Sequence, residues 1–377
     1  MECNFQSLSE IGFMQSFWET DQLSIIDFSI VGGGILGLFT AYELSLKYPK
    51  ARIAIFERDL FAAGATSRNA GFACFGSVTE IAADRKQWGD SKTLEIVNKR
   101  WKGIQRIQSL LGDKINYENY GGYELFIDKP ILQQDLDEIN SYLNPVFQEI
   151  VFKQQPEKIK EFGFSANTQS LVFNPFEGQI HSGKLILALH ELLRAKNVHF
   201  FANSEVTSYE DGSPIEFIIN NKHKVQTEKL IFCTNAFPPI NQLQIKPARG
   251  QVLITKPIPN LKLRGCFHFQ EGYYYFRNVD NRILFGGGRH LDIHGETDTR
   301  FLLNELIQKD LIEKLNTIIA PSHMPDIEQQ WSGIMAFTDN KLPMIKYIGK
   351  HVIYAMNCNG MGISLSPITA QEITELL

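Results

Sequence analysis

The sequence predicts an α/β protein in which two domains interleave, and three observations support this fold class. The chain has 377 residues, which exceeds the length of one typical domain. Residues 24–57 run through an apolar strand, a glycine-rich turn, a helix and a second apolar strand. Further apolar strands follow much later, at residues 229–234 and 351–355, with a β-rich section at 249–286 between them. The chain would therefore leave its first domain and return to it more than once.

The glycine-rich turn at residues 32–37 is the most specific motif of this sequence. A strand over residues 24–31 precedes it, and a helix over 38–48 and a strand over 52–56 follow it. Glu57 closes the unit at the distance from the turn that a dinucleotide-binding fold requires. This order predicts a Rossmann-like unit.

Each residue of that unit has a physical role. Gly32 permits a tight turn, Gly34 lets the backbone approach a pyrophosphate, and Gly37 lets the helix pack closely on the strands. The helix N-terminus offers free N–H groups and a partial positive charge to phosphates. The carboxylate of Glu57 would accept hydrogen bonds from ribose hydroxyls and repel a 2′-phosphate. The unit therefore favours FAD or NAD over NADP.

Composition and charge exclude several classes of protein. A net charge of −5 and the lack of a dense Lys/Arg run argue against a nucleic-acid surface. No run of about 18 apolar residues is present, and the first residues lack the pattern of a signal peptide. We therefore expect a cytoplasmic protein without a transmembrane segment. Nine histidines and five scattered cysteines show no metal-binding spacing, which predicts reduced thiols and no metal site.

Hydrophobic periodicity and turn residues predict the remaining elements. Helices are expected at residues 68–71 after a Ser67 cap, 86–111, 132–142, 182–193, 301–315 and 362–376. Strands are expected at 121–127, 199–202, 205–209, 214–219, 222–227, 249–255 and 329–336, and as a hairpin at 272–277 and 282–286.

Seven segments, spread over nearly the whole chain, form a recognisable series. They are residues 30–37, 64–71, 233–236, 247–251, 284–288, 331–333 and 359–362. In order and spacing this series resembles the D-amino-acid-oxidase-like superfamily of FAD-dependent oxidoreductases, which includes glycine, sarcosine and gamma-glutamylputrescine oxidases. The resemblance is specific for the superfamily and does not identify a substrate.

The resemblance implies FAD, with its flavin where the two domains meet. The glycine turn would hold the pyrophosphate, Glu57 the adenosine ribose, and the backbone at Val206 the adenine. The loop at 64–71 would wrap the central part of FAD, and the helix start at 360–362 would stabilise negative charge on the flavin pyrimidine. The cofactor-binding residues so implied are Gly32, Gly34, Ile35, Leu36, Gly37, Glu57, Arg58, Thr66, Ser67, Arg68, Asn69, Ala70, Val206, Thr234, Asn235, Gly333, Gly360, Met361 and Gly362.

The domain boundaries follow from these positions. We expect the FAD-binding domain in residues 1–85, 165–245 and 325–377. The second, an α+β substrate domain on a mixed or antiparallel sheet, is expected in residues 86–164 and 246–324. Cys358 matches no position at which relatives attach flavin covalently, so FAD is expected to bind noncovalently.

The cationic residues of the substrate side have alternative interpretations. Relatives that oxidise α-amino acids often carry an arginine two residues after the glycine equivalent to Gly333, to grip the substrate carboxylate. Met335 stands in that place here, so a clamp at this spot is absent. Arg249 and Arg289 remain as candidates to bind a carboxylate, or as salt-bridged structural arginines.

Aromatic residues give the second set of substrate-side candidates. Tyr273 and Tyr275 would share one face of a strand and either line the cavity or fill the core. His181 and His290 are expected to be structural. The substrate-pocket candidates are Phe75, Arg249, Gln251, Tyr273, Tyr275, Arg289, Trp331 and Met335.

The resemblance implies the oxidation of a C–N bond in a small amine or amino acid. A hydride would pass to flavin N5, the imine product would hydrolyse, and oxygen or another acceptor would reoxidise the flavin. The missing arginine favours an amine or a modified amino acid over a simple α-amino acid. Oxidation of a 2-hydroxy acid or another alcohol, and a flavin-binding module with little turnover, are the alternatives. No catalytic base is assigned.

Overall fold

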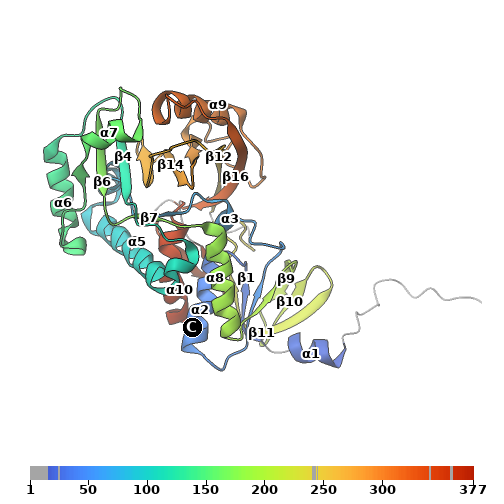
Figure 1. Ribbon diagram of the computed structural model, residues 1–377. Coiled ribbons are helices and arrows are strands. Elements are labelled where there is room, and N and C mark those ends of the chain that lie inside the picture. Colours follow the sequence, from blue (N-terminus) through green and yellow to red (C-terminus); the bar gives the residue numbers. More distant parts are fainter. Residues whose placement is uncertain (1–15, 24–25, 240–242, 244, 339–340, 357–359) are drawn as a thin grey trace, which may run out of the picture.

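The chain forms two eight-stranded sheets and one small two-stranded sheet. The computed structural model describes residues 16–23, 26–239, 243, 245–338, 341–356 and 360–377. Ser24 and Ile25 at the start of the first predicted strand, Cys3 and Cys358 lie outside the described residues. Figure 1 shows the two large sheets in separate halves of the molecule, with long helices against the first.

The first large sheet is built on parallel strands. Its central order is β17-β18-β11-β1-β2-β8, and β10 and β9 extend it from β11. β1 pairs parallel with both β2 and β11, and Ile30 of β1 lies beside Ile231 of β11. Its strands are β1 (Ile26–Val31), β2 (Ile53–Phe56), β8 (His199–Phe201), β9 (Val206–Glu210), β10 (Ile215–Ile219), β11 (His223–Phe232), β17 (Met344–Tyr347) and β18 (Val352–Met356).

Three long helices cover this sheet. α2 (Ile35–Lys47) connects β1 to β2 and packs against α8 (Ser182–Ala195) and α10 (Gly362–Leu376). α10 also crosses α5 (Asp90–Leu111) at Gly103, where a Cβ would lie 1.7 Å from the carbonyl oxygen of Ser364. Close approach at that crossing therefore requires glycine.

The structure corrects three helix predictions. α2 begins at Ile35, three residues earlier than expected, because Gly34 is already its N-cap. The helix expected over 86–111 is two helices, α4 (Val78–Trp88) and α5, because Gly89 adopts a φ of +81° between them. Ser67 is not a cap: it lies inside α3 (Ala65–Arg68), whose N-cap is Gly64.

The second large sheet is mostly antiparallel. Its order is β16-β12-β15-β14-β13-β4-β6-β5, and β14 and β15 form the predicted hairpin. β6 and β16 belong to this sheet, although the expected boundaries group residues 165–174 and 325–337 with the nucleotide domain. Its strands are β4 (Gly122–Phe126), β5 (Lys153–Gln154), β6 (Ser170–Asn174), β12 (Lys246–Thr255), β13 (Cys266–Phe269), β14 (Tyr274–Val279), β15 (Arg282–Gly287) and β16 (Ile327–Phe337).

The remaining elements complete a mixed α/β fold, as predicted. They are α1 (Phe17–Leu23), α6 (Gln133–Phe147), α7 (Pro156–Phe162), α9 (Glu305–Lys314), and the small sheet of β3 (Phe72–Ala73) and β7 (Gly178–Gln179). No helix in the described part of the chain is long and apolar enough to cross a membrane.

Candidate functional site

A cavity of about 810 Å³ takes its walls from both large sheets. Val31, Phe56, Phe232 and Met356 line it, and they are the last residues of β1, β2, β11 and β18. Ligands of open parallel sheets bind outside the carboxyl ends of the strands, so this is the expected place for a cofactor. The volume lies in the range of small-molecule sites.

The glycine turn forms one wall of the cavity, and its geometry requires glycine at two positions. Gly32 has a φ of +107°, and a Cβ there would lie 2.7 Å from the carbonyl oxygen of Cys233. A Cβ on Gly37 would lie 2.0 Å from the carbonyl oxygen of Gly32. Gly37 does not line the cavity, so its role is to let α2 approach β1, as predicted. Gly34 and Ile35 line the cavity at the start of α2.

Glu57 is buried in the wall beside the turn, with 7% of its surface exposed. Its Oε2 accepts a 2.7 Å hydrogen bond from the backbone N–H of Gly33, and its Oε1 accepts one of 3.1 Å from that of Asp59. Each carboxylate oxygen can accept a further bond, so Glu57 both holds the turn and keeps capacity for ribose hydroxyls. Val206, at the start of β9, also lines the cavity.

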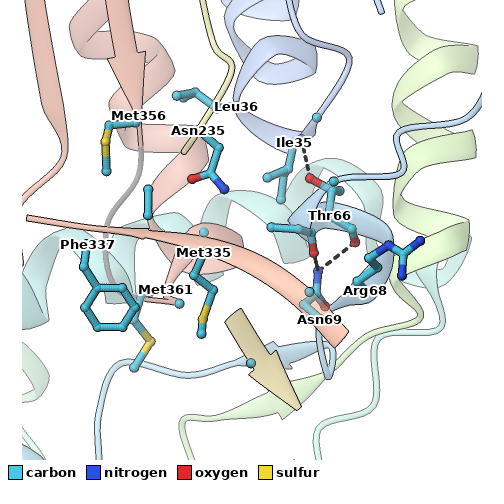
Figure 2. Close-up of a pocket in the computed structure, with 18 of the residues that line it drawn as sticks. Ile35, Leu36, Thr66, Arg68, Asn69, Asn235, Met335, Phe337, Met356 and Met361 are labelled. Carbon is cyan, nitrogen blue, oxygen red and sulfur yellow. Dashed lines mark hydrogen bonds between the residues drawn. The ribbon is translucent and has the colours of Figure 1, made fainter. Parts of the chain in front are cut away.

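The segment 64–71 folds against the same turn. Thr66 Oγ1 accepts a 2.9 Å hydrogen bond from the backbone N–H of Ile35 (Figure 2). The Asn69 amide donates to the carbonyl of Thr66 at 2.7 Å, and its oxygen accepts from the N–H of Gly71 at 2.7 Å. Thr66, Arg68, Asn69 and Ala70 line the cavity, and Ser67 does not. The side chains of this segment therefore fix its own conformation before any ligand binds.

The start of α10 forms a further part of the cavity wall, next to the start of α2. Gly360, Met361 and Gly362 all line the cavity, and Gly360 has a φ of +79°. Figure 2 shows Met361 near Phe337, with Asn235 on the far side of β16. The amide of Asn235 donates to the carbonyl of Ile334 at 3.0 Å, which ties the segment after β11 to β16.

The residues present fit an elongated anionic dinucleotide. The N-termini of α2 and α10 both reach the cavity, and each brings backbone N–H groups and the positive end of a helix dipole. Of the predicted cofactor residues, the structure brings all except Gly37 and Ser67 to the cavity wall.

Four of the eight substrate-side candidates line the cavity. They are Tyr273, Tyr275, Arg289 and Met335. Tyr274 faces the other way, is 1% exposed and donates to Asp310 Oδ2 at 2.7 Å, so the predicted alternation along this strand is correct. The ring of Tyr275 packs directly against Gly286. A Cβ at Gly286 would lie 2.7 Å from that ring, so glycine makes room for the tyrosine.

Arg249 and Gln251 share a side as predicted, but that side faces Glu296 and not the cavity. Arg249 Nη2 lies 2.7 Å from Glu296 Oε1, and both side chains are buried. Gln251 Nε2 donates to Glu296 Oε2 at 2.9 Å. The Glu296 carboxylate holds the pKa of Arg249 above its ordinary value. Of the two alternatives for Arg249, the structure supports the salt-bridged structural arginine. The expectation that Arg249 and Gln251 line the substrate pocket is corrected, because both contact the buried Glu296 carboxylate.

Phe75 and Trp331 are likewise absent from the cavity wall. The Phe75 ring is fully buried and lies 4.8 Å from that of Phe147, within the core over the first sheet. Trp331 Nε1 donates to the carbonyl of Arg68 at 3.1 Å, so Trp331 helps to hold the segment 64–71 in place. His181 is structural as expected, since its ring accepts from the N–H of Lys184 at the start of α8.

The structure adds cavity residues that the sequence did not indicate. His268 on β13 lines the cavity, and burial lowers its pKa to about 4. Glu80, Asp84 and Lys341 form a charged group at the wall, with Lys341 Nζ 2.7 Å from Asp84 Oδ1 and 3.6 Å from Glu80 Oε1. His290, expected to be structural, also lines the cavity. Among the described residues no cluster suited to a metal ion is present.

The comparison with protein families decides which ligand this cavity serves. A family model described as FAD dependent oxidoreductase matches residues 27–376. The chain belongs to this family of FAD-dependent oxidoreductases. The resemblance seen in the sequence is thereby confirmed, and so is the expectation of FAD. The glycine turn, Glu57 and the start of α10, which the resemblance implies as cofactor-binding groups, all contribute residues to the cavity wall.

Individual relatives are distant but cover nearly the whole chain. The glycine oxidase of Geobacillus kaustophilus is 22% identical over 379 residues, which is 93% of this chain and 92% of that protein. The gamma-glutamylputrescine oxidoreductase of Escherichia coli is 20% identical over 371 residues, 93% of this chain and 83% of that protein. The crystal structure of L-proline dehydrogenase from P. horikoshii has a TM-score of 0.74 at 16% identity, with 94% of this chain and 93% of that chain covered. That structure confirms the fold.

Proposed function

We propose that this flavoenzyme oxidises a carbon–nitrogen bond of a small amine or amino acid. The observation that carries the proposal is a neutral polar wall made by His268 and Tyr275. These two residues are cross-strand partners on β13 and β14, and both line the cavity. Burial lowers the pKa of His268 to about 4 and raises that of Tyr275 to about 12, so both are uncharged at neutral pH.

The wall suits the protonation state that amine oxidation needs. An amine must be neutral before its lone pair can assist the departure of hydride from the adjacent carbon. His268 lines the cavity, and its buried Nε2 has no hydrogen-bond partner among the described residues, so a polar group bound beside the ring would satisfy it. A neutral imidazole accepts a hydrogen bond from a substrate N–H without adding a charge. The bound FAD supplies the hydride acceptor, and the imine product then hydrolyses in water.

The relatives support the same class of substrate. The two curated proteins described above are named for glycine and for gamma-glutamylputrescine, and the solved structure for L-proline. All three names refer to compounds with an amine or imino nitrogen.

Anaerobic mixing of the purified holoenzyme with panels of amines, amino acids and 2-hydroxy acids tests the proposal. We expect the yellow flavin absorbance to bleach with at least one nitrogen compound. Bleaching by 2-hydroxy acids alone would contradict the proposal and favour alcohol oxidation. Tight binding of ligands that never bleach the flavin would indicate a binding module.

Two variants test the part played by the neutral wall. His268→Gln should slow flavin reduction while FAD content stays unchanged. His323→Gln is the matched control, because His323 is exposed and does not line the cavity. Equal reduction rates in His268→Gln and the unsubstituted enzyme would remove His268 from the proposed role.

A further inference from the structure

A second cavity lies between α8 and the edge of the first large sheet, and it shares no residue with the cavity described above. Its volume is about 250 Å³. Four apolar and two basic side chains line it, namely Ile55, Leu193, Val198 and Phe200, and His190 and Arg194. Packing between a helix and a sheet normally leaves few voids larger than a water molecule, so a space of this size can admit a small molecule.

The apolar part of this second cavity sets the size and character of its ligand. An apolar cavity of about 150 Å³ is already large enough to hold benzene. The Phe200 ring forms one wall and lies 4.3 Å from the ring of His190, measured between centroids. Burial lowers the pKa of His190, so its imidazole is uncharged at neutral pH. The body of the ligand is therefore apolar and about as large as a six-membered ring.

A single positive charge lies at the mouth of this apolar space. Arg194 is exposed, and its side chain has no ion pair or hydrogen bond within the described part of the chain. The cavity wall contains no acidic residue. A planar guanidinium presents parallel donors that match the two oxygens of a carboxylate. The charge of the wall thus favours an acid and disfavours an amine.

Phe200 connects the second cavity to the glycine turn. A Cβ on Gly33 would lie 2.9 Å from the Phe200 ring, so the ring packs directly on the backbone of the turn. The N–H of Gly33 donates to Glu57, and the N–H of Glu57 donates to the carbonyl of Phe201 at 2.9 Å. The turn, Glu57 and β8 are therefore linked by direct contacts, and a ligand that holds Phe200 in place also holds the turn.

We propose that the second cavity binds a small carboxylic acid with an apolar ring, and that the bound acid slows the release of FAD. Arg194 holds the carboxylate, and the ring packs against Phe200 and Leu193. A ligand favours the conformation that it binds better, which here is the one with Phe200 packed on Gly33. The inference is independent of the proposed oxidation, because it concerns a separate cavity and needs no turnover.

Calorimetry on the holoenzyme with cyclohexanecarboxylate tests the site, and cyclohexanecarboxamide is the uncharged comparison. We expect the carboxylate to bind about threefold more tightly than the amide, because an exposed ion pair contributes modestly. Arg194→Gln should abolish this preference, and Arg194→Lys should keep part of it. Lys196→Gln is the matched control, since Lys196 is also exposed at the end of α8 but does not line the cavity. No binding, or an equal preference in Arg194→Gln and the unsubstituted enzyme, would overturn the site.

Release of FAD after dilution of the holoenzyme, followed by the fluorescence of the freed cofactor, tests the link to the glycine turn. We expect cyclohexanecarboxylate to slow release about fivefold, the lower end of couplings between two sites. The same concentration should slow it less in Arg194→Gln and to the full extent in Lys196→Gln. Binding that depends on Arg194 but leaves the release of FAD unchanged would overturn the link through Phe200.

Discussion

The Glu57 carboxylate accepts a 2.7 Å hydrogen bond from the backbone N–H of Gly33, across 24 positions of sequence. The acid at the end of β2 therefore orients the glycine turn at the end of β1. One side chain links the two features by which the dinucleotide-binding unit was predicted. It acts on the turn through Oε2 and retains acceptor capacity for a ribose.

Glu57→Gln should weaken FAD binding by about tenfold or more, because hydrogen bonds to charged groups contribute about 1.5–3 kcal/mol and 1.4 kcal/mol corresponds to a factor of ten. The amide oxygen of glutamine can still accept from Gly33, so the fold should persist. Titration of the apoprotein with FAD measures the change. Glu191→Gln on the exposed face of α8 is the control. Equal FAD affinity in both variants would show that Glu57 does not hold the ribose.

Gly37→Ala should destabilise the protein, because the new Cβ would lie 2.0 Å from the carbonyl oxygen of Gly32. Overpacking of this kind typically costs about 1–3 kcal/mol of the free energy of unfolding. The shift of α2 should also reduce FAD retention. Gly64→Ala is the matched control, since a Cβ at Gly64 meets no atom within 4 Å. Urea unfolding with equal midpoints for the two variants would contradict the close-approach argument.

Arg249→Met should destabilise the fold by about 3–5 kcal/mol, because it leaves the buried Glu296 carboxylate without its charge partner. The double substitution Arg249→Met with Glu296→Leu should recover most of that loss. Urea unfolding measures both effects. The rate of flavin reduction by a substrate found in the anaerobic panels should be the same in the folded double variant and in the unsubstituted enzyme. A selective loss of that rate would instead return Arg249 to the substrate site.

The cofactor half of the site could be predicted from sequence because its parts are short contiguous segments. The turn at 32–37, the loop at 64–71 and the helix start at 360–362 each bring residues that are adjacent in the sequence to the cavity wall. Their geometry depends on local conformation, which glycine placement determines. Helix bounds do not follow from apolar periodicity alone, because a single glycine such as Gly89 can end one helix and begin another.

The substrate half could not be predicted, because it depends on pairing between distant residues. Arg249 and Arg289 have similar sequence contexts, because each lies in or next to a predicted strand and each has a glycine as a neighbour. They differ because Glu296, 47 positions from Arg249, pairs with the first and leaves the second incompletely bonded. His268 was missed because its strand, β13, is only four residues long and lies between β14, its neighbour in sequence, and β4, which is far away in the sequence.

His268 should also make the stability of the fold depend on pH. Burial lowers its pKa from 6.5 to about 4, although the nearby Glu80 carboxylate acts in the opposite direction. The unfolded chain therefore binds more protons than the folded protein between these two values. It follows that acidification from pH 6.5 towards pH 4 favours unfolding, and that the contribution is absent above pH 6.5.

His268→Phe should reduce this pH dependence. The phenylalanine keeps a ring beside Phe72, whose centroid lies 5.2 Å from that of His268, but it cannot take up a proton. Unfolding by urea at a series of pH values across that interval measures the slope. We expect the stability of the unsubstituted enzyme to fall more steeply with acidification than that of the variant. The exposed His323→Gln control should keep the full slope. Parallel curves for His268→Phe and the unsubstituted enzyme would mean that the imidazole is not held neutral by burial, and the neutral wall proposed for amine binding would lose its physical basis.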